Sequence, residues 1–120
     1  MKRCNNVLKG KGWLMSAFLL LIIAEKPIHG YNIGKKLGEF GINLKGVSNK
    51  GRIYTFLSSY EEEGYIESNW DTQYSPPRKI YNITQKGLEY LNSIEEEIVI
   101  MKDYLDHFSD RLANIKNRQG

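Results

Sequence analysis

VSNKGRIYTFLSSYEEEGYIESNWDTQYSPPRKIYNIT, residues 47–84, predicts one helix followed by a hairpin with a polar tip. The Ser48 hydroxyl is suited to accept a hydrogen bond from an unpaired N–H of a first helical turn, so we expect Ser48 to cap a helix over residues 49–63. Gly64 then supplies the left-handed residue at which such a helix stops. Apolar side chains recur at helical spacing on one face of this segment: Ile53, Phe56, Leu57 and Tyr60.

The opposite face of this helix is polar and, apart from one arginine, short-chained. It carries Ser48, Arg52, Thr55 and Ser59. Such a face fits a DNA major groove, which is about 12 Å wide and in which arginine pairs with guanine through two hydrogen bonds. An ordinary solvated helix has the same composition, so the helix alone leaves both interpretations open.

Two alternating segments follow, residues 65–71 and 79–84, and they predict a pair of strands. The connection over residues 72–78 is longer than a tight turn, and its two consecutive prolines fix the backbone and remove two N–H donors. We therefore expect a stiff wing. Arg78 and Lys79 at its base are placed to reach phosphates or a minor groove, unless they only keep an edge strand soluble.

The length of 120 residues allows one domain with one appended element. The net charge of +3 hides an asymmetry, because residues 1–60 contain ten Lys/Arg against two acids and residues 61–120 contain seven against twelve. A basic first half suits a protein that presents one surface to a polyanion. A basic binder of membrane surfaces would have the same sign, so charge alone does not select DNA.

The apolar run WLMSAFLLLIIA at residues 13–24 imitates a secretory signal. It is shorter than the roughly 20 residues needed to span a bilayer, and charged residues and a proline at positions 25–27 replace a small-residue cleavage site. We therefore expect a buried helix over residues 12–25 and no membrane partner. The lone Cys4 cannot form an internal disulfide, which is consistent with a cytoplasmic protein.

A second helix is predicted over residues 29–40, with His29 near its start and Gly41 as its stop. One face is apolar and the other basic: Ile33, Leu37 and Phe40 against Lys35 and Lys36. The order of helix, helix, turn, helix and wing is that of a winged helix-turn-helix. The predicted fold class is thus mainly α with a small β wing.

The last third predicts a long helix that begins at Gln85 behind a capping Thr84. Apolar residues recur in it at alternating spacings of three and four: Leu91, Ile94, Ile98, Met101, Leu105, Phe108, Leu112 and Ile115. A heptad seam this long is typical of a coiled coil, so we expect homodimerisation through it. The alternative is a helix packed along its own domain. Tyr104 and Phe108 lie near the seam, where they would line a ligand pocket between paired helices or simply form core.

Other chemistries find no support in the sequence. The histidines at positions 29 and 107 stand on different elements without neighbouring ligands at metal spacing. We identify no phosphate-binding loop and no catalytic set, and we expect no cofactor, no metal and no enzymatic activity.

Three segments in this order resemble the PadR family of transcriptional regulators: LLLIIAEKPIHGYNIGKKL, KGRIYTFLSSYEEEGYIES and PPRKIYNITQKGLEYL. The resemblance covers the chain from about position 12 to beyond position 112. It implies a dimeric winged-helix repressor whose C-terminal helix pairs with its twin and with the first helix of the other subunit. By this resemblance, Tyr31 and Tyr54 match aromatic positions near the DNA-facing helices, and positions 50, 52 and 55 match the recognition segment.

The predicted function is therefore a homodimeric PadR-type repressor that binds a palindromic operator in double-stranded DNA and is open to relief by a small-molecule effector. The predicted DNA contacts are Tyr31, Lys35, Lys36, Ser48, Asn49, Lys50, Arg52, Tyr54, Thr55, Arg78 and Lys79. Residues 1–84 would form the DNA-binding domain and residues 85–117 the dimerisation helix. The chain departs from many relatives in having Ser75 before the two prolines and an arginine at position 52. The alternative function is a winged-helix module that binds a protein and no operator.

Overall fold

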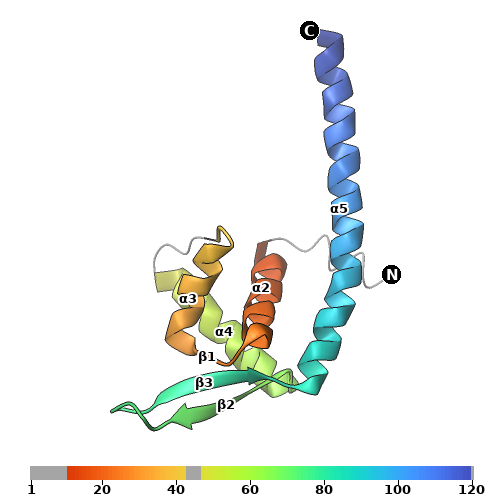
Figure 1. The fold of residues 1–120 in the computed structure, drawn as a ribbon. Helices are drawn as coiled ribbons and strands as arrows, with labels where there is room; N and C mark the ends of the chain where they lie inside the picture. Colours follow the sequence, from red (N-terminus) through yellow and green to blue (C-terminus); the bar gives the residue numbers. More distant parts are fainter. Residues whose placement is uncertain (1–10, 43–46, 120) are drawn as a thin grey trace.

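A computed structural model describes residues 11–42 and 47–119 of the chain. The elements follow one another as α2 (Lys11–Glu25), β1 (Ile28–His29), α3 (Gly30–Glu39), α4 (Val47–Glu63), β2 (Ile66–Asp71), β3 (Arg78–Ile83) and α5 (Gln85–Gln119). Helices α2, α3 and α4 form a head above the small sheet, and α5 rises beside α2 and extends far beyond it (Figure 1). The fold is a winged helix-turn-helix followed by a long C-terminal helix, as predicted.

The core of the head is centred on α2, the apolar run that imitates a secretory signal. Leu19, Leu20, Ile22 and Ile23 are almost completely buried there. The helix contacts α3, α4, α5 and β3, which cover most of its surface. Leu14 and Leu21, seven positions apart on one face, remain 39% and 37% exposed. A helix covered on most sides needs little polar surface, which explains its weak amphipathic character. Within the described residues, no helix is both long and apolar enough to cross a bilayer.

Helices α3 and α4 pack on α2 through the predicted apolar stripes. Ile33 and Leu37 of α3 are fully buried. Ile53 and Leu57 of α4 are almost as well buried, with exposed fractions of 4% and 1%. Gly41 has a positive φ of 84° just after α3 and ends it. The prediction that Phe40 completes the buried face was wrong: it follows the last residue of α3 and stays 43% exposed, in contact with Phe18 at its rim.

The start of α4 differs from the prediction. The helix begins at Val47 rather than at position 49, so Ser48 lies inside the first turn and is not its N-cap. The side chains of Ser48, Asn49 and Lys50 lie outside the described residues. At the other end, Gly64 has φ 82°, and the Tyr65 N–H donates to the Tyr60 carbonyl oxygen at 2.9 Å, which confirms the predicted glycine stop.

The wing is a three-stranded antiparallel sheet in the order β1-β3-β2. β2 and β3 form the predicted hairpin, whose last pair is Asp71 with Arg78. Residues 72–77 form its tip, so Arg78 belongs to a strand rather than to the connection. The sequence did not predict β1, whose Ile28 pairs with Tyr81. Because β1 pairs with β3 and ends directly before α3, it holds the start of α3 against the wing.

Helix α5 starts as predicted, because the Thr84 hydroxyl oxygen accepts a hydrogen bond from the Gly87 N–H at 3.1 Å. The same hydroxyl donates to the carbonyl oxygens of Gly64 and Tyr65 at 2.6 and 2.9 Å. Thr84 thus joins the end of α4, the start of β2 and the start of α5. Gly87 is buried at this junction.

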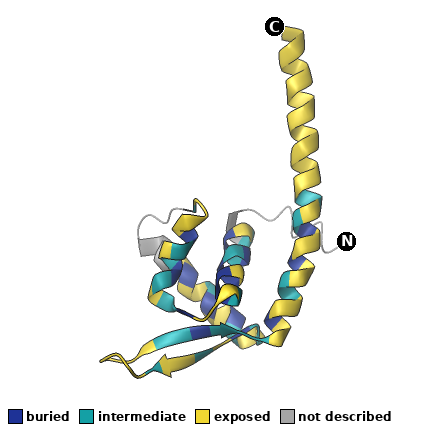
Figure 2. Cartoon of the chain, in the orientation of Figure 1, coloured by how far each residue is buried: buried dark blue, intermediate teal, exposed yellow. Residues whose placement is uncertain are grey.

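The two halves of α5 differ in burial. Leu91 and Ile94 pack against the head, with Ile94 only 6% exposed, whereas every described residue from Lys102 onward is exposed (Figure 2). The distal half of the heptad seam therefore has no partner within the described chain, and Leu105 and Phe108 are 60% and 69% exposed. Packing along its own domain accounts only for the first half of this helix.

Candidate nucleic-acid interface

The outward face of α4 presents the polar side chains that the sequence placed opposite the core. Arg52, Thr55 and Ser59 are exposed. The Thr55 hydroxyl donates to the Gly51 carbonyl oxygen at 2.9 Å, which leaves its methyl group directed away from that bond. Among the described residues, no carboxylate lies within ion-pair distance of Arg52, so its guanidinium is available to a ligand.

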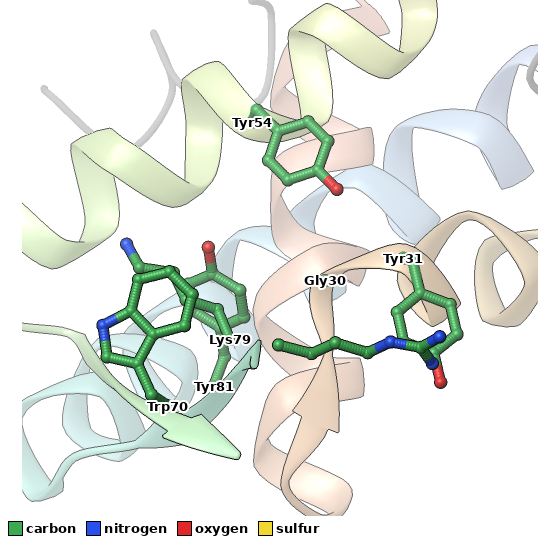
Figure 3. Close-up of a pocket in the computed structure, with 7 residues that line it drawn as sticks. Gly30, Tyr31, Tyr54, Trp70, Lys79 and Tyr81 are labelled. Carbon is green, nitrogen blue, oxygen red and sulfur yellow. The ribbon is translucent and has the colours of Figure 1, made fainter. Parts of the chain in front are cut away.

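A pocket of about 260 Å³ lies where α3, α4 and the wing meet. Its lining comes from every one of these elements: Gly30, Tyr31, Tyr54, Trp70, Arg78, Lys79 and Tyr81. Tyr54 reaches from α4 over Gly30, with Trp70, Lys79 and Tyr81 grouped on one side and Tyr31 on the other (Figure 3). The structure thus brings together four residues predicted from distant parts of the sequence: Tyr31, Tyr54, Arg78 and Lys79.

The pocket has one buried tyrosine and several exposed aromatic side chains. Tyr81 is 4% exposed, and burial raises the pKa of its hydroxyl, with the Glu61 carboxylate acting in the same direction. Tyr31, Tyr54 and Trp70 are each at least half exposed. Three exposed aromatic side chains thus surround the cations Arg78 and Lys79, and such exposed apolar surface is often found at binding sites.

The two cations of the wing have different environments. The Lys79 ammonium lies 3.6 Å from the Glu61 carboxylate, which also accepts a hydrogen bond from Ser68 at 2.8 Å. The Arg78 guanidinium instead lies over the rings of Tyr31 and Tyr74, at 4.6 and 4.2 Å from their centroids. Lys79 is therefore paired with a carboxylate and lies farther from aromatic faces, at 5.9 Å from the centroids of Trp70 and Tyr81, whereas Arg78 lies close over two rings.

Lys35 and Lys36 occupy another part of the surface. With Lys26 and Asn32 they line a hollow of about 350 Å³ that shares no residue with the first pocket. Lys36 is also paired with Glu39 at 3.5 Å. His29 also lines this hollow, so the hollow adjoins the first pocket, and DNA contacts by Lys35 and Lys36 stay predictions.

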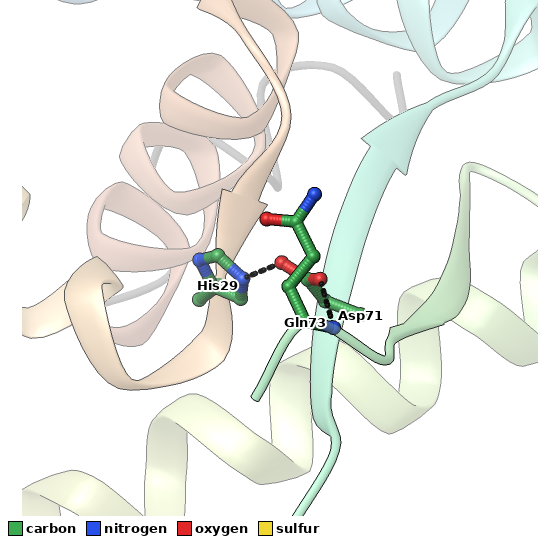
Figure 4. Close-up of polar contacts among 3 residues, drawn as sticks. All are labelled: His29, Asp71 and Gln73. Atoms are coloured by element: carbon green, nitrogen blue, oxygen red, sulfur yellow. Dashed lines mark hydrogen bonds and ion pairs between the residues drawn. The ribbon is translucent and has the colours of Figure 1, made fainter. Parts of the chain in front are cut away.

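His29, Asp71 and Tyr74 lie beside this pocket and were not predicted. The His29 Nε2 atom lies 2.9 Å from Asp71 Oδ2, and the Gln73 N–H donates to Asp71 Oδ1 at 3.1 Å (Figure 4). The hydrogen bond with His29 is the main cause that lowers the pKa of Asp71. His29 stands at the N-cap of α3, yet its side chain makes no capping hydrogen bond, because it is directed to the wing.

Residues 19–93 match the family described as "Transcriptional regulator PadR-like family". The chain belongs to the PadR-like family of transcriptional regulators. This match covers more than half of the chain, and it includes α3, α4, the wing and the first part of α5. The PadR-like family consists of transcriptional regulators and not of enzymes, in agreement with the sequence.

Solved structures resemble this PadR-like chain over most of its length. A conserved protein of unknown function, described as a potential transcriptional factor, is 39% identical with a TM-score of 0.78, over 91% of this chain and 96% of its own. A PadR family transcription regulator from Clostridium difficile is 28% identical with a TM-score of 0.67, over 78% and 96%. A PadR-like transcriptional regulator from Bacillus cereus is 27% identical with a TM-score of 0.67, over 79% and 90%. Family and fold together support a DNA-binding transcriptional regulator.

Proposed function

We propose that this chain is a cytoplasmic, homodimeric repressor that binds a palindromic operator. In each subunit α4 enters a major groove, and the wing contacts the flanking backbone. The observation that carries this proposal is the surface shared by α4, α3 and the wing. Exposed Arg52 and Thr55 stand on α4, and an aromatic pocket with two cations lies next to them.

The side chains on this surface fall into two groups, one suited to bases and one suited to phosphates. Arg52 on the outer face of α4 is suited to base edges, because guanine offers two acceptors that match a guanidinium. Tyr31, Tyr54, Arg78 and Lys79 surround the adjacent pocket, where hydroxyl groups and cations suit phosphate oxygens. Ser48, Asn49 and Lys50 in the first turn of α4 and Lys35 and Lys36 on α3 complete the proposed contacts.

Dimerisation rests on the distal half of α5. Four apolar side chains of the seam are exposed there: Leu105, Phe108, Leu112 and Ile115. Covering a leucine or phenylalanine side chain contributes roughly 1.5–3 kcal/mol, so a second α5 helix would gain substantially by packing on this stripe. Residues 85–117 would then form the dimerisation helix and residues 1–84 the DNA-binding domain.

The proposal includes control by an effector, which is supported by a hollow along α5. A groove of about 500 Å³ runs between α2 and α5 and is largely apolar, with Leu21, Leu88, Leu91 and Ile98 in its lining. A small molecule that binds between paired α5 helices would change the separation of the two heads. Because half-site spacing is a geometric requirement, that change would weaken operator binding and relieve repression.

The test is fluorescence anisotropy of the purified protein with DNA from upstream of its own gene and with scrambled DNA, across a salt series. We expect tighter binding to one sequence and a linear fall of log affinity with log salt. Sedimentation of the same preparation should give a dimer. Equal weak binding to all DNA together with a monomer would overturn the proposal and favour a protein-binding winged helix.

A further inference from the structure

Arg78 lies between two tyrosine rings that come from different parts of the chain. Tyr31 belongs to the first turn of α3 and Tyr74 to the tip of the wing. The guanidinium carbon is 4.6 Å from one ring centroid and 4.2 Å from the other. Both distances are within the range of cation–π attraction. Two rings therefore restrain the guanidinium, although Arg78 is exposed.

The two rings are themselves held by His29. Its imidazole stacks on Tyr31 with a centroid distance of 5.4 Å and meets Tyr74 edge-on at 5.4 Å. Its Nε2 atom is bonded to Asp71 at 2.9 Å, and Asp71 also accepts the Gln73 N–H (Figure 4). The last residue of β2 is thereby tied to the residue that precedes α3, which fixes the wing tip relative to the helices.

Within the described part of the chain, the guanidinium of Arg78 makes no close ion pair, and its stacked faces leave its N–H groups directed outward. Stacking uses the faces of a guanidinium, while its N–H groups point outward in its plane. Among residues 11–42 and 47–119, no carboxylate lies within ion-pair distance of this group, whereas Lys79 has Glu61 at 3.6 Å. The wing thus contains one cation that is paired with Glu61 and one, Arg78, that lies over two tyrosine rings and acts on the Asp71 carboxylate only from beyond ion-pair distance.

We infer that the Tyr31–Arg78–Tyr74 clamp presents the Arg78 guanidinium to a phosphate of the DNA backbone, with Tyr74, His29 and Asp71 as positioning residues. This inference rests on the proposed DNA-binding function. A planar fork of N–H donors matches two phosphate oxygens, and the wing lies outside the helix that would read bases. The clamp restricts the side chain before binding, so less conformational entropy is lost when the contact forms.

The test is a double-mutant cycle on operator binding with Arg78→Ala, Tyr74→Ala and the double variant, followed by anisotropy over a salt series. We expect Arg78→Ala to weaken binding on the order of tenfold for specific and scrambled DNA alike. The slope of log affinity against log salt should become shallower by about 0.9, because Arg78→Ala leaves one phosphate without its cation. Arg118→Ala, which removes an exposed cation at the far end of α5, should leave affinity unchanged.

The cycle separates positioning from direct contact. Tyr74→Ala should weaken binding several-fold in the wild type and have little further effect in the Arg78→Ala background, whereas Tyr74→Phe, which keeps the ring, should bind as the wild type does. Equal effects of Tyr74→Ala in both backgrounds would overturn the clamp. A loss of affinity for Arg78→Ala confined to the specific sequence would overturn the phosphate role. If the wild type bound no DNA, the proposed function itself would fail before any variant is compared.

Discussion

His29 Nε2 and Asp71 Oδ2 meet at 2.9 Å across 42 residues of sequence. The contact joins the end of β1 to the end of β2, although these two strands are not neighbours in the sheet and β3 lies between them. It therefore spans the sheet at its open end, next to the wing tip. Any change that breaks this bond should act on the wing and leave the core of the head intact.

The pKa of Asp71 is lowered from its ordinary value of 3.8, chiefly by the hydrogen bond with His29. A carboxyl whose folded pKa lies below its unfolded value stabilises the fold above the unfolded pKa, and this contribution is lost as pH falls through the folded value. We expect Asp71→Asn to flatten the acid side of the stability profile below about pH 4, as measured by thermal melts followed by circular dichroism. Identical acid profiles for both proteins would contradict this assignment.

Gly87 lies where α5, β2 and β3 come together, and it has no room for a side chain. A Cβ there would overlap the Tyr65 carbonyl oxygen and lie 2.7 Å from Ile83 Cδ1. Replacing glycine by alanine inside a helix normally stabilises by about 0.5–1 kcal/mol, whereas overpacking costs typically 1–3 kcal/mol. We expect Gly87→Ala to destabilise in urea melts. Gly51→Ala is the control, because a Cβ at Gly51 in α4 meets nothing within 4 Å and should be neutral or stabilising.

The elements that could be predicted from the sequence are those set by local patterns. The apolar spacing of Ile53 and Leu57 and the stop at Gly64 describe α4, and the capping of Gly87 by Thr84 describes the start of α5. These features depend on residues a few positions apart, so periodicity and capping preferences are sufficient to find them. The family resemblance added the order of the segments.

The features that could not be predicted depend on contacts between residues that are distant in sequence. β1 has only two residues and so has no detectable period, and its pairing with β3 depends on the tertiary fold. The stacking of Arg78 on Tyr31 likewise requires the wing and α3 to be in contact, which no spacing along the chain reveals. From the sequence, Arg78 and Lys79 were therefore predicted to have the same role. In the structure their environments differ, because Glu61 lies 3.6 Å from the Lys79 ammonium and forms no ion pair with Arg78.

Tyr60 of α4 forms a hydrogen bond with α2 in the core of the head. Its hydroxyl donates to the Ser16 carbonyl oxygen of α2 at 2.7 Å, and burial raises its pKa to about 12. A phenol whose folded pKa is raised stabilises the fold below its unfolded pKa near 10, and this contribution is lost as pH rises through the folded value. Tyr60→Phe should therefore lose about 0.5–1.5 kcal/mol at neutral pH and show a weaker loss of stability between pH 10 and pH 12. If the wild type and Tyr60→Phe lost stability equally between pH 10 and pH 12, the raised pKa of Tyr60 would not be the cause of the alkaline loss.

Leu105 and Val99 allow a matched test of the proposed dimer. Both lie on α5 and are almost equally exposed, at 60% and 61%, but only Leu105 belongs to the heptad seam. Leu105→Asp should place a charge in the apolar interface of the dimer and shift sedimentation toward the monomer. Val99→Asp should leave the dimer intact. The same shift for both variants would mean that the association does not use this seam.

Arg52 is the residue expected to read a base. It is exposed on α4 and near the N-terminal end of this helix, where recognition helices contact base edges. We expect Arg52→Ala to cost roughly 1–3 kcal/mol on the operator and to reduce discrimination against scrambled DNA. Ser59→Ala, two turns further along the same face, should change binding little, because in the proposed docking the C-terminal part of α4 lies farther from the bases. Competition binding with single-base operator variants would show which position loses its preference. Equal losses of affinity on specific and scrambled DNA would assign Arg52 to the backbone instead.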